Sequence, residues 1–155
     1  IKGGYYVIEL AKMMPDVCFI VAGQVVDDFE VPRNMILLGK LDSQELLAKH
    51  YSMADVTVLT SKRETFSMVC AESLCCGTPV VGFKAGAPEQ IAISEYSMFV
   101  EHGNIKALVQ AMQRASFIAT TKAEINYEAR NIYSKEKMVE KYMKAYGLLL
   151  NTWRY

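Results

Sequence analysis

Apolar residues along the chain follow two different spacings, and the two spacings alternate. Residues 7–14 carry apolar side chains three and four positions apart, which predicts an amphipathic helix that ends at Pro15. Residues 17–22 form a nearly continuous apolar run that stops at a glycine, which is typical of a strand buried on both faces. Residues 35–38 repeat that run before Gly39 and predict a second such strand.

Further helices and strands follow along the chain, which ends in three successive predicted helices. Asp42, followed by Glu45, resembles a capping box and predicts a helix that reaches about Met53. Asn104 is expected to cap a later helix, and the proline at position 79 is expected to open a strand. The remaining predicted strands cover residues 55–59, 79–82 and 98–100, and the remaining helices cover residues 67–76, 88–93, 104–115, 122–131 and 134–155.

Short buried strands that alternate with helices predict a parallel sheet covered on both sides. We therefore expect residues 1–155 to form one α/β domain with a doubly wound, Rossmann-like parallel sheet and helices on both faces. Such sheets bind ligands beyond the carboxyl ends of their strands. Candidate chemistry is expected at that edge.

Composition narrows the possible functions. The chain has 155 residues, 17 basic and 17 acidic side chains, and 52% apolar residues. This balance argues against a general nucleic-acid or membrane-surface binder, because either needs a basic excess. No apolar run reaches the roughly 18 residues of a membrane span.

The four cysteines, Cys18, Cys70, Cys75 and Cys76, lie among apolar residues and lack the spacing of zinc ligands. We expect all four to be buried thiols, not disulfides or metal ligands. Free thiols indicate a reducing compartment, so we expect a cytoplasmic protein without a bound metal.

Residues 60–89 carry the chemistry of the chain. Glu64 is expected in a loop after a strand, and Glu72 within the helix that follows. The first turn of a helix offers free N–H groups and a positive dipole end to a phosphate. Glu72 can accept hydrogen bonds from a ribose diol, and Glu64 can reach hydroxyls on the other side of the phosphates. The expected ligand is a nucleoside diphosphate sugar, and the first turn consists of Phe66, Ser67, Met68 and Val69.

Each of these residues also has an interpretation without a ligand. Glu64 could be a solvated loop carboxylate, and Glu72 could favour its helix only through the dipole. Ser67 is an ordinary N-cap as well as a phosphate contact. Phe66 and Phe83 are expected to pack in the core and not to stack on a base.

Further polar residues near this segment are ambiguous. Glu89 is an equally good candidate for a sugar contact and for a cap of its own short helix. Lys62 and Arg63 are expected to be a solvated pair. His50 and His102 lack a partnered acid or a ligand spacing, so we expect no catalytic role for them.

The same segment resembles the signature of the family-4 retaining glycosyltransferases. That signature has two glutamates separated by seven residues, then a Gly-Thr-Pro-Val run, then a glycine turn that ends in Pro-Glu. Further parts of the chain resemble the family in the same order. The matching positions are Lys2-Gly3, Val21-Ala22-Gly23, Leu38-Gly39-Lys40-Leu41, Ala54-Asp55-Val56, Thr60-Ser61, Glu64, Glu72, Gly77-Thr78-Pro79-Val80 and Ala85-Gly86-Ala87-Pro88-Glu89.

The resemblance implies a two-domain GT-B enzyme, of which this chain would be the C-terminal, donor-binding part. It assigns the diphosphate to Lys2, the donor-sugar hydroxyls to Glu64 and the ribose to Glu72. It implies transfer to an acceptor hydroxyl with retention of anomeric configuration, without a metal or cofactor. The other donor-binding positions that it implies are Phe66, Ser67, Met68, Val69, Gly23, Leu41, Gly86 and Glu89.

The resemblance also implies partners outside this chain. The acceptor, a glycan or lipid-linked sugar in polysaccharide biosynthesis, would bind the N-terminal domain, so we expect the chain alone to be inactive. The helix over residues 134–155 carries Val139, Tyr142, Met143, Tyr146 and Leu149 along one face and is expected to pack toward that domain. The intact enzyme could contact the inner face of the membrane peripherally.

Three departures from the family pattern, and two rival functions, remain. A strand with a phosphate-binding arginine is expected before Lys2 and does not precede it here. Thr65 and Ala85 stand where the family often has glycine. The rivals are a non-catalytic nucleotide-sugar-binding module and a related GT-B epimerase or phosphorylase.

Overall fold

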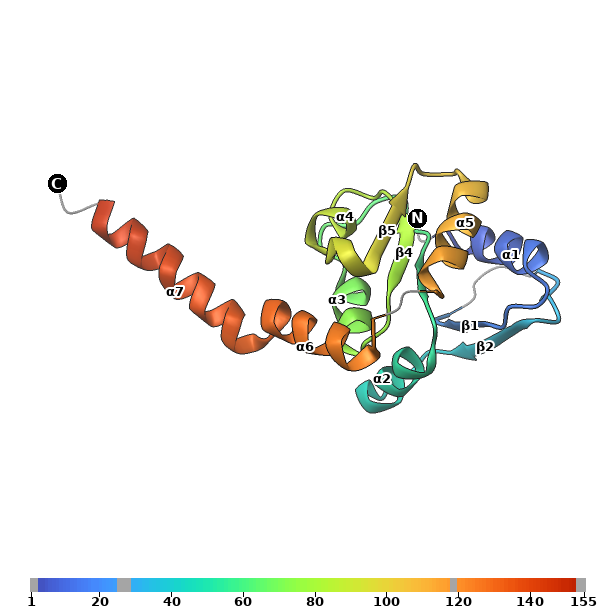
Figure 1. Cartoon of the computed structure of the whole chain (residues 1–155), viewed down its shortest axis with the longest axis horizontal. Coiled ribbons are helices and arrows are strands. Elements are labelled where there is room, and N and C mark those ends of the chain that lie inside the picture. The colour runs from blue at the N-terminus through green and yellow to red at the C-terminus, as the bar shows by residue number, and fades with distance from the viewer. Residues whose placement is uncertain (1–2, 25–28, 118–119, 153–155) are drawn as a thin grey trace.

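The fold contains the helices and strands expected from the sequence, with successive helices after the last described strand (Figure 1). The computed structural model describes residues 3–24, 29–117 and 120–152. Its elements are α1 (Gly4–Met13), β1 (Phe19–Ala22), β2 (Met35–Gly39), α2 (Gln44–Met53), β3 (Thr57–Leu59), α3 (Met68–Cys75), β4 (Val80–Phe83), α4 (Pro88–Ile91), the 3-10 helix η1 (Ser94–Tyr96), β5 (Ser97–Val100), α5 (Ile105–Ala115), α6 (Lys122–Tyr133) and α7 (Lys135–Thr152).

All of the strand pairs are parallel, as expected, but they form two ladders. β1 pairs with β2, while β3, β4 and β5 form a second ladder in that order. Within the described residues, β3 forms ladder pairs with β4 alone. Side-chain packing joins the ladders, because Phe19 and Met35 share one buried cluster with Val81 and Phe83 of β4.

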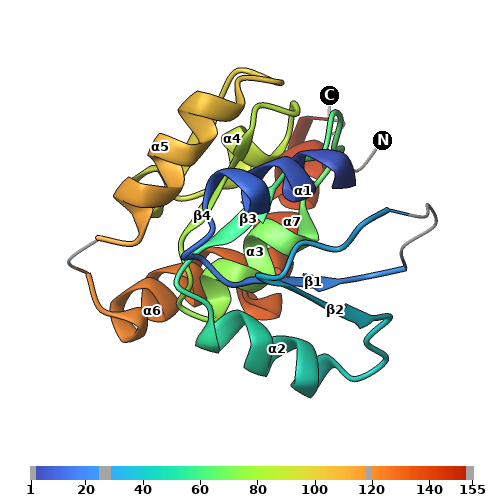
Figure 2. The same cartoon turned by 90° about the vertical axis from the view of Figure 1, so that its right-hand side faces the viewer.

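The helices cover both faces of the strands, which confirms the doubly wound α/β class. Val81 and Phe83 face the cluster formed with α1 and α5, whereas Val80 faces the cluster formed with α3 and α6. This alternation follows from the two-residue period of a strand. Figure 2 shows α1 and α5 on one side of the strands, with α2 and α6 on the other.

The β1–β2 ladder departs from the expectation of strands buried on both faces. Ile20 and Ile36 lie opposite each other in the register, and their side chains are exposed. The other face of these strands carries buried Phe19 and Met35. The prediction that these two apolar runs form strands buried on both faces is therefore wrong.

Two predicted element starts are wrong by one residue. Ser43, and not Asp42, caps α2, since its side chain accepts a hydrogen bond from the N–H of Leu46 at 3.2 Å. Asp42 instead forms an exposed ion pair with Lys40. Strand β4 begins after Pro79, whose carbonyl accepts from Thr57 although the proline has no N–H for the ladder.

The cysteines are all free, but the prediction that all four are buried is wrong. Cys70 is fully buried, Cys75 and Cys76 are partly buried, and Cys18 is exposed just before β1. Burial raises the pKa of the Cys70 thiol to about 12. The apolar sequence around Cys18 does not bury it, because β1 has one open face.

Helix α7 extends away from the rest of the fold (Figure 1). The side chains of its apolar face are largely exposed, including Val139, Tyr142, Met143 and Tyr146. Its packing toward an N-terminal domain therefore stays a prediction. None of the helices in the part of the chain described here has the length and apolar character needed to cross a membrane.

Candidate functional site

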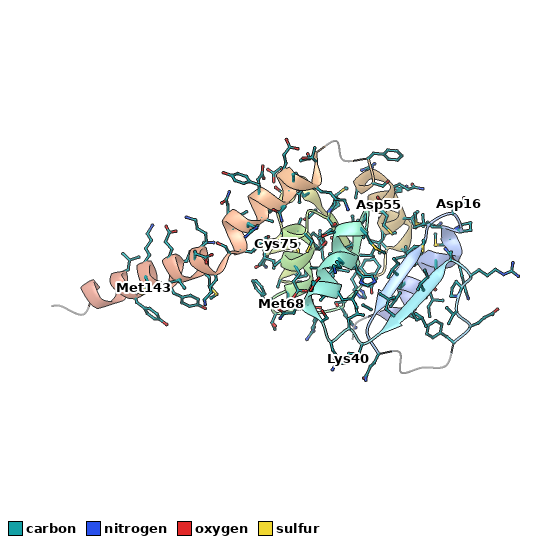
Figure 3. All side chains as sticks on the ribbon, turned by 90° about the horizontal axis from the view of Figure 1, so that it is seen from below. Asp16, Lys40, Asp55, Met68, Cys75 and Met143 are labelled. Carbon is teal, nitrogen blue, oxygen red and sulfur yellow. The ribbon has the colours of Figure 1, made fainter. Side chains whose placement is uncertain are left out.

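The carboxyl ends of both ladders face the same side of the molecule. In Figure 3, Asp16 and Asp55, which precede β1 and β3, lie at one edge. Lys40, which follows β2, and Met68, the first residue of α3, lie at the opposite edge. The predicted site residues follow strands or begin helices at that second edge, as expected for a doubly wound sheet.

The loops that follow β3 and β4 are joined by their backbones. The N–H of Glu64 donates to the carbonyl of Ala85 at 3.0 Å, and Glu64 forms an isolated parallel bridge with Gly86. Gly86 has a φ of 103°, a conformation that glycine tolerates and other residues rarely adopt. This pairing fixes the half-buried Glu64 beside the glycine turn.

Glu89 anchors the glycine turn from the first turn of α4. Its two carboxylate oxygens accept from the N–H groups of Ala85 at 3.0 Å and Gly86 at 2.9 Å. Partial burial opposes ionisation of Glu89, but these backbone hydrogen bonds outweigh it and lower the pKa. Of the two roles left open by the sequence, this geometry favours capping and loop anchoring; a sugar contact stays a prediction.

The amino end of α3 opens toward solvent. Buried Ser67 caps the helix by accepting from the N–H of Cys70 at 3.4 Å. The N–H groups of Met68 and Val69 have no acceptor within the helix, as for the first turn of any helix, and both residues are exposed. The helix end therefore offers N–H donors and a positive dipole end to an anion.

The two phenylalanines near this edge have different surroundings. Phe83 is completely buried, which confirms its predicted packing role. Phe66 is 50% exposed beside the amino end of α3, so the prediction that it packs in the core is wrong. A β-strand residue such as Phe83 is covered by helices, whereas Phe66 lies in a loop that covers only half of its side chain.

The start of α1 is pressed against the end of β3. A Cβ on Gly3 would lie 2.2 Å from the carbonyl oxygen of Thr60, and Gly3 itself has a φ of 69°. Glycine is thus required for this close approach. A second helix start therefore lies beside the loop that carries Glu64; Lys2 itself lies outside the described residues.

Glu72 lies partly buried in α3, and its carboxylate has a partner that sequence reasoning missed. The phenol of Tyr51, in the last turns of α2, donates to Oε2 of Glu72 at 3.3 Å. Burial first, and then the charge of Glu72, raises the pKa of Tyr51. No spacing signals this contact, because the two residues lie 21 positions apart on different helices.

The remaining candidates lie after β1 and β2, at the carboxyl edge of the strands, or in the loop before Glu64. Gly23 directly follows β1, and its N–H donates to the carbonyl of Gly39 at 2.8 Å. Half-buried Leu41 follows β2 before α2. These positions belong to the other ladder, so their part in one site with Glu64 stays a prediction. Lys62 and Arg63 are exposed, as expected of a solvated pair.

Both histidines contact other residues of the fold. His50 contacts the carbonyl of Leu46 one turn earlier in α2 at 2.8 Å. His102 packs its ring against Tyr6 and Phe83, with ring centroids 5.6 and 5.1 Å apart. Among the residues that the structure describes, no group of three or more acidic, histidine or cysteine side chains could hold a metal ion.

Comparison with solved structures defines the class to which this fold belongs. Sucrose-phosphate synthase from Thermosynechococcus elongatus matches 97% of the chain with a TM-score of 0.79 and 23% identity. Anabaena HepE in complex with UDP-glucose matches 94% of the chain with a TM-score of 0.77 and 17% identity. The chain covers 43% and 45% of these structures. Its fold is that of one Rossmann-like half of a GT-B glycosyltransferase.

Sequence comparison identifies the family. Residues 2–132 match the model of the glycosyl transferases group 1, and the chain belongs to that family. N-acetyl-alpha-D-glucosaminyl L-malate synthase of Bacillus anthracis is 33% identical over 102 residues, which are 64% of this chain and 25% of that protein. D-inositol 3-phosphate glycosyltransferase of Thermomonospora curvata is 56% identical over 43 residues, which are 28% of this chain and 10% of that protein. The chain thus spans a quarter or less of these relatives.

Proposed function

We propose that this chain is the donor-binding half of a retaining glycosyltransferase. The intact protein would transfer a sugar from a nucleoside diphosphate to an acceptor hydroxyl. The observation that carries the proposal is the open amino end of α3, with the Glu64 loop before it and Glu72 within it. Family membership makes sugar transfer the natural chemistry for this arrangement.

Each part of the site has a role in this proposal. The N–H groups of Met68 and Val69 bind the diphosphate, and the dipole of α3 stabilises its charge as it leaves. Glu72 accepts hydrogen bonds from the ribose hydroxyls. Glu64, fixed by its backbone pairing with Gly86, accepts from hydroxyls of the donor sugar.

The donor sugar would lie between the glycine turn and the start of α1. The contact of Gly3 with Thr60 supports this position, because it brings the start of α1 to the loop before Glu64. We propose that Lys2 compensates the diphosphate charge there and that Leu41 lies beside the base. The transferred sugar keeps its anomeric configuration, and no metal is required.

The rest of the enzyme supplies the acceptor. A second domain would bind a glycan or lipid-linked sugar, and α7 would pack against it through its exposed apolar face. The chain alone would then bind the donor without turnover. We place the intact enzyme in the cytoplasm, with peripheral contact at the inner face of the membrane.

A turnover experiment separates the enzyme from a non-catalytic binding module. A UDP-sugar is the first donor to test, because HepE, a structural neighbour, was solved with UDP-glucose. In the full-length protein, Glu64→Gln is expected to lower kcat at least a hundredfold while the Kd for UDP changes less than threefold. Glu95→Gln, at an exposed glutamate on η1, is the matched control and should change neither value. Full turnover in Glu64→Gln would remove the sugar role of Glu64, and absence of turnover with any nucleotide sugar would favour the binding module.

A further inference from the structure

Glu72 is not an isolated acceptor, because a phenol from another helix already holds one of its oxygens. Tyr51 donates to Oε2 of Glu72 at 3.3 Å across the contact between α2 and α3. Among the described residues, no protein group donates to the other oxygen, Oε1. The contact therefore divides the carboxylate into one oxygen held by the protein and one oxygen left for a ligand.

The backbone around Tyr51 is fixed by hydrogen bonds from two other parts of the fold. The hydroxyl of Thr78, which is completely buried, donates to the carbonyl of Tyr51 at 2.6 Å. Lys122, from α6, donates to the carbonyls of Ser52 and Ala54 at 2.5 and 2.6 Å. Three carbonyls at the end of α2, those of Tyr51, Ser52 and Ala54, are thus bound by other parts of the fold, which restricts movement of Tyr51 away from Glu72.

The protonation state of the phenol suits a permanent donor. Burial and the adjacent carboxylate raise the pKa of Tyr51, so the phenol keeps its proton over the physiological range. A carboxylate offers about four lone-pair sites on its two oxygens. A donor on one oxygen restricts rotation of the carboxylate and directs the lone pairs of the second oxygen.

We propose that Tyr51 is a positioning residue that orients Glu72 toward a vicinal diol and so sets the preference of the site for ribonucleotides. The inference rests on the proposed function, since Glu72 must be the ribose contact. Tyr51 itself need not touch the ligand. Without its hydroxyl, Glu72 would rotate freely and would bind the diol less well, while contacts to the diphosphate would be unchanged.

The experiment compares two ligands that differ only in the diol. Binding of UDP and of 2′,3′-dideoxy-UDP to the full-length protein is measured by calorimetry. Tyr51→Phe is expected to weaken binding of UDP about three- to tenfold, less than the direct loss of a hydrogen bond to a charged group, because Tyr51 acts on the ligand only through the orientation of Glu72. Binding of the dideoxy ligand should change less than twofold. Tyr51→Gln, which restores an N–H donor, should recover part of the discrimination and also serves if the phenylalanine variant does not fold.

A matched control removes a phenol hydroxyl elsewhere. Tyr133 donates to the carbonyl of Ile91 from α6, away from Glu72, and Tyr133→Phe should leave both affinities within twofold. Equal losses for both ligands in Tyr51→Phe, or no loss for either, would overturn the role of Tyr51. Glu72→Gln distinguishes the two proposals: if it also leaves the preference for UDP over the dideoxy ligand unchanged, the ribose assignment of Glu72 itself fails.

Discussion

Glu64 and Gly86 lie side by side in an isolated parallel bridge, although 22 positions separate them and they follow different strands. The bridge holds the loop after β3 against the loop after β4. Glu89 holds the same turn by accepting from the N–H groups of Ala85 and Gly86. Glu64, which we propose accepts hydrogen bonds from the donor sugar, is therefore positioned by backbone contacts that do not depend on its own side chain.

Gly86→Ala tests this positioning. The φ of 103° disfavours any residue with a Cβ, and relieving that strain would move the turn away from Glu64. We expect a loss of stability of about 1–3 kcal/mol, measured by urea unfolding, together with at least tenfold lower kcat in the full-length protein. Gly147→Ala, in α7, where a Cβ would meet nothing within 4 Å, is the control. Unchanged turnover in Gly86→Ala would show that the turn does not position Glu64.

The anchoring carboxylate gives a pH-dependent prediction. The pKa of Glu89 is lowered in the folded state, so its contribution to stability is fully present above the pKa of an unfolded glutamate. That contribution is lost as the pH falls through the lowered folded value. Glu89→Gln should thus lower the urea midpoint of unfolding at pH 7. The difference in midpoint between wild type and variant should shrink as the pH falls below about 4. A difference that is constant with pH would contradict ionised anchoring.

A great part of the fold was predictable from the sequence because each element carries its own local signal. The caps Ser67 and Asn104 and the terminators Pro15 and Gly39 follow from short-range chemistry, and the structure confirms them as element boundaries. The one-residue error at Ser43 arose because two adjacent residues are both good caps. Exposure was harder to predict, since Ile36 and Cys18 lie in apolar runs with one uncovered side.

The candidate site was predictable only in part. The loop after β3 and the start of α3 were expected from strand-then-helix order and glutamate spacing, and the structure confirms both elements. The Tyr51–Glu72 contact and the Glu64–Gly86 bridge were missed, since each depends on how distant segments pack. The open position of Phe66 was missed for the same reason, because apolar character alone does not say which loop is covered.

Gly77 makes a further stability prediction. It has a φ of 79°, and a Cβ there would lie 2.3 Å from the carbonyl oxygen of Lys122, at the contact between α3 and α6. Since both the conformation and the contact exclude a side chain, Gly77→Ala is expected to cost about 2 kcal/mol or more in chemical unfolding. A cost below that of Gly147→Ala would show that α6 does not pack as described.

Thiol reactivity tests the burial of the cysteines. Cys70, with its pKa raised to about 12 by burial, should resist alkylation at pH 8, because the thiolate is the nucleophile. Exposed Cys18 should react fastest in the native protein, and Cys18→Ser should remove that fast phase. Mass spectrometry after brief iodoacetamide treatment identifies the modified residue. Early labelling of Cys70 would contradict the buried core around α3.

Calorimetric titration of nucleoside diphosphates against the wild-type protein and the Glu72→Gln variant asks whether the amino end of α3 binds the donor nucleotide. We expect that at least one of UDP, GDP and ADP binds, and that Glu72→Gln weakens that binding about tenfold or more, as for lost charged hydrogen bonds to the ribose. Glu95→Gln should leave the affinity within twofold. Absence of binding by all three, or an unchanged affinity in Glu72→Gln, would contradict a donor site at the amino end of α3.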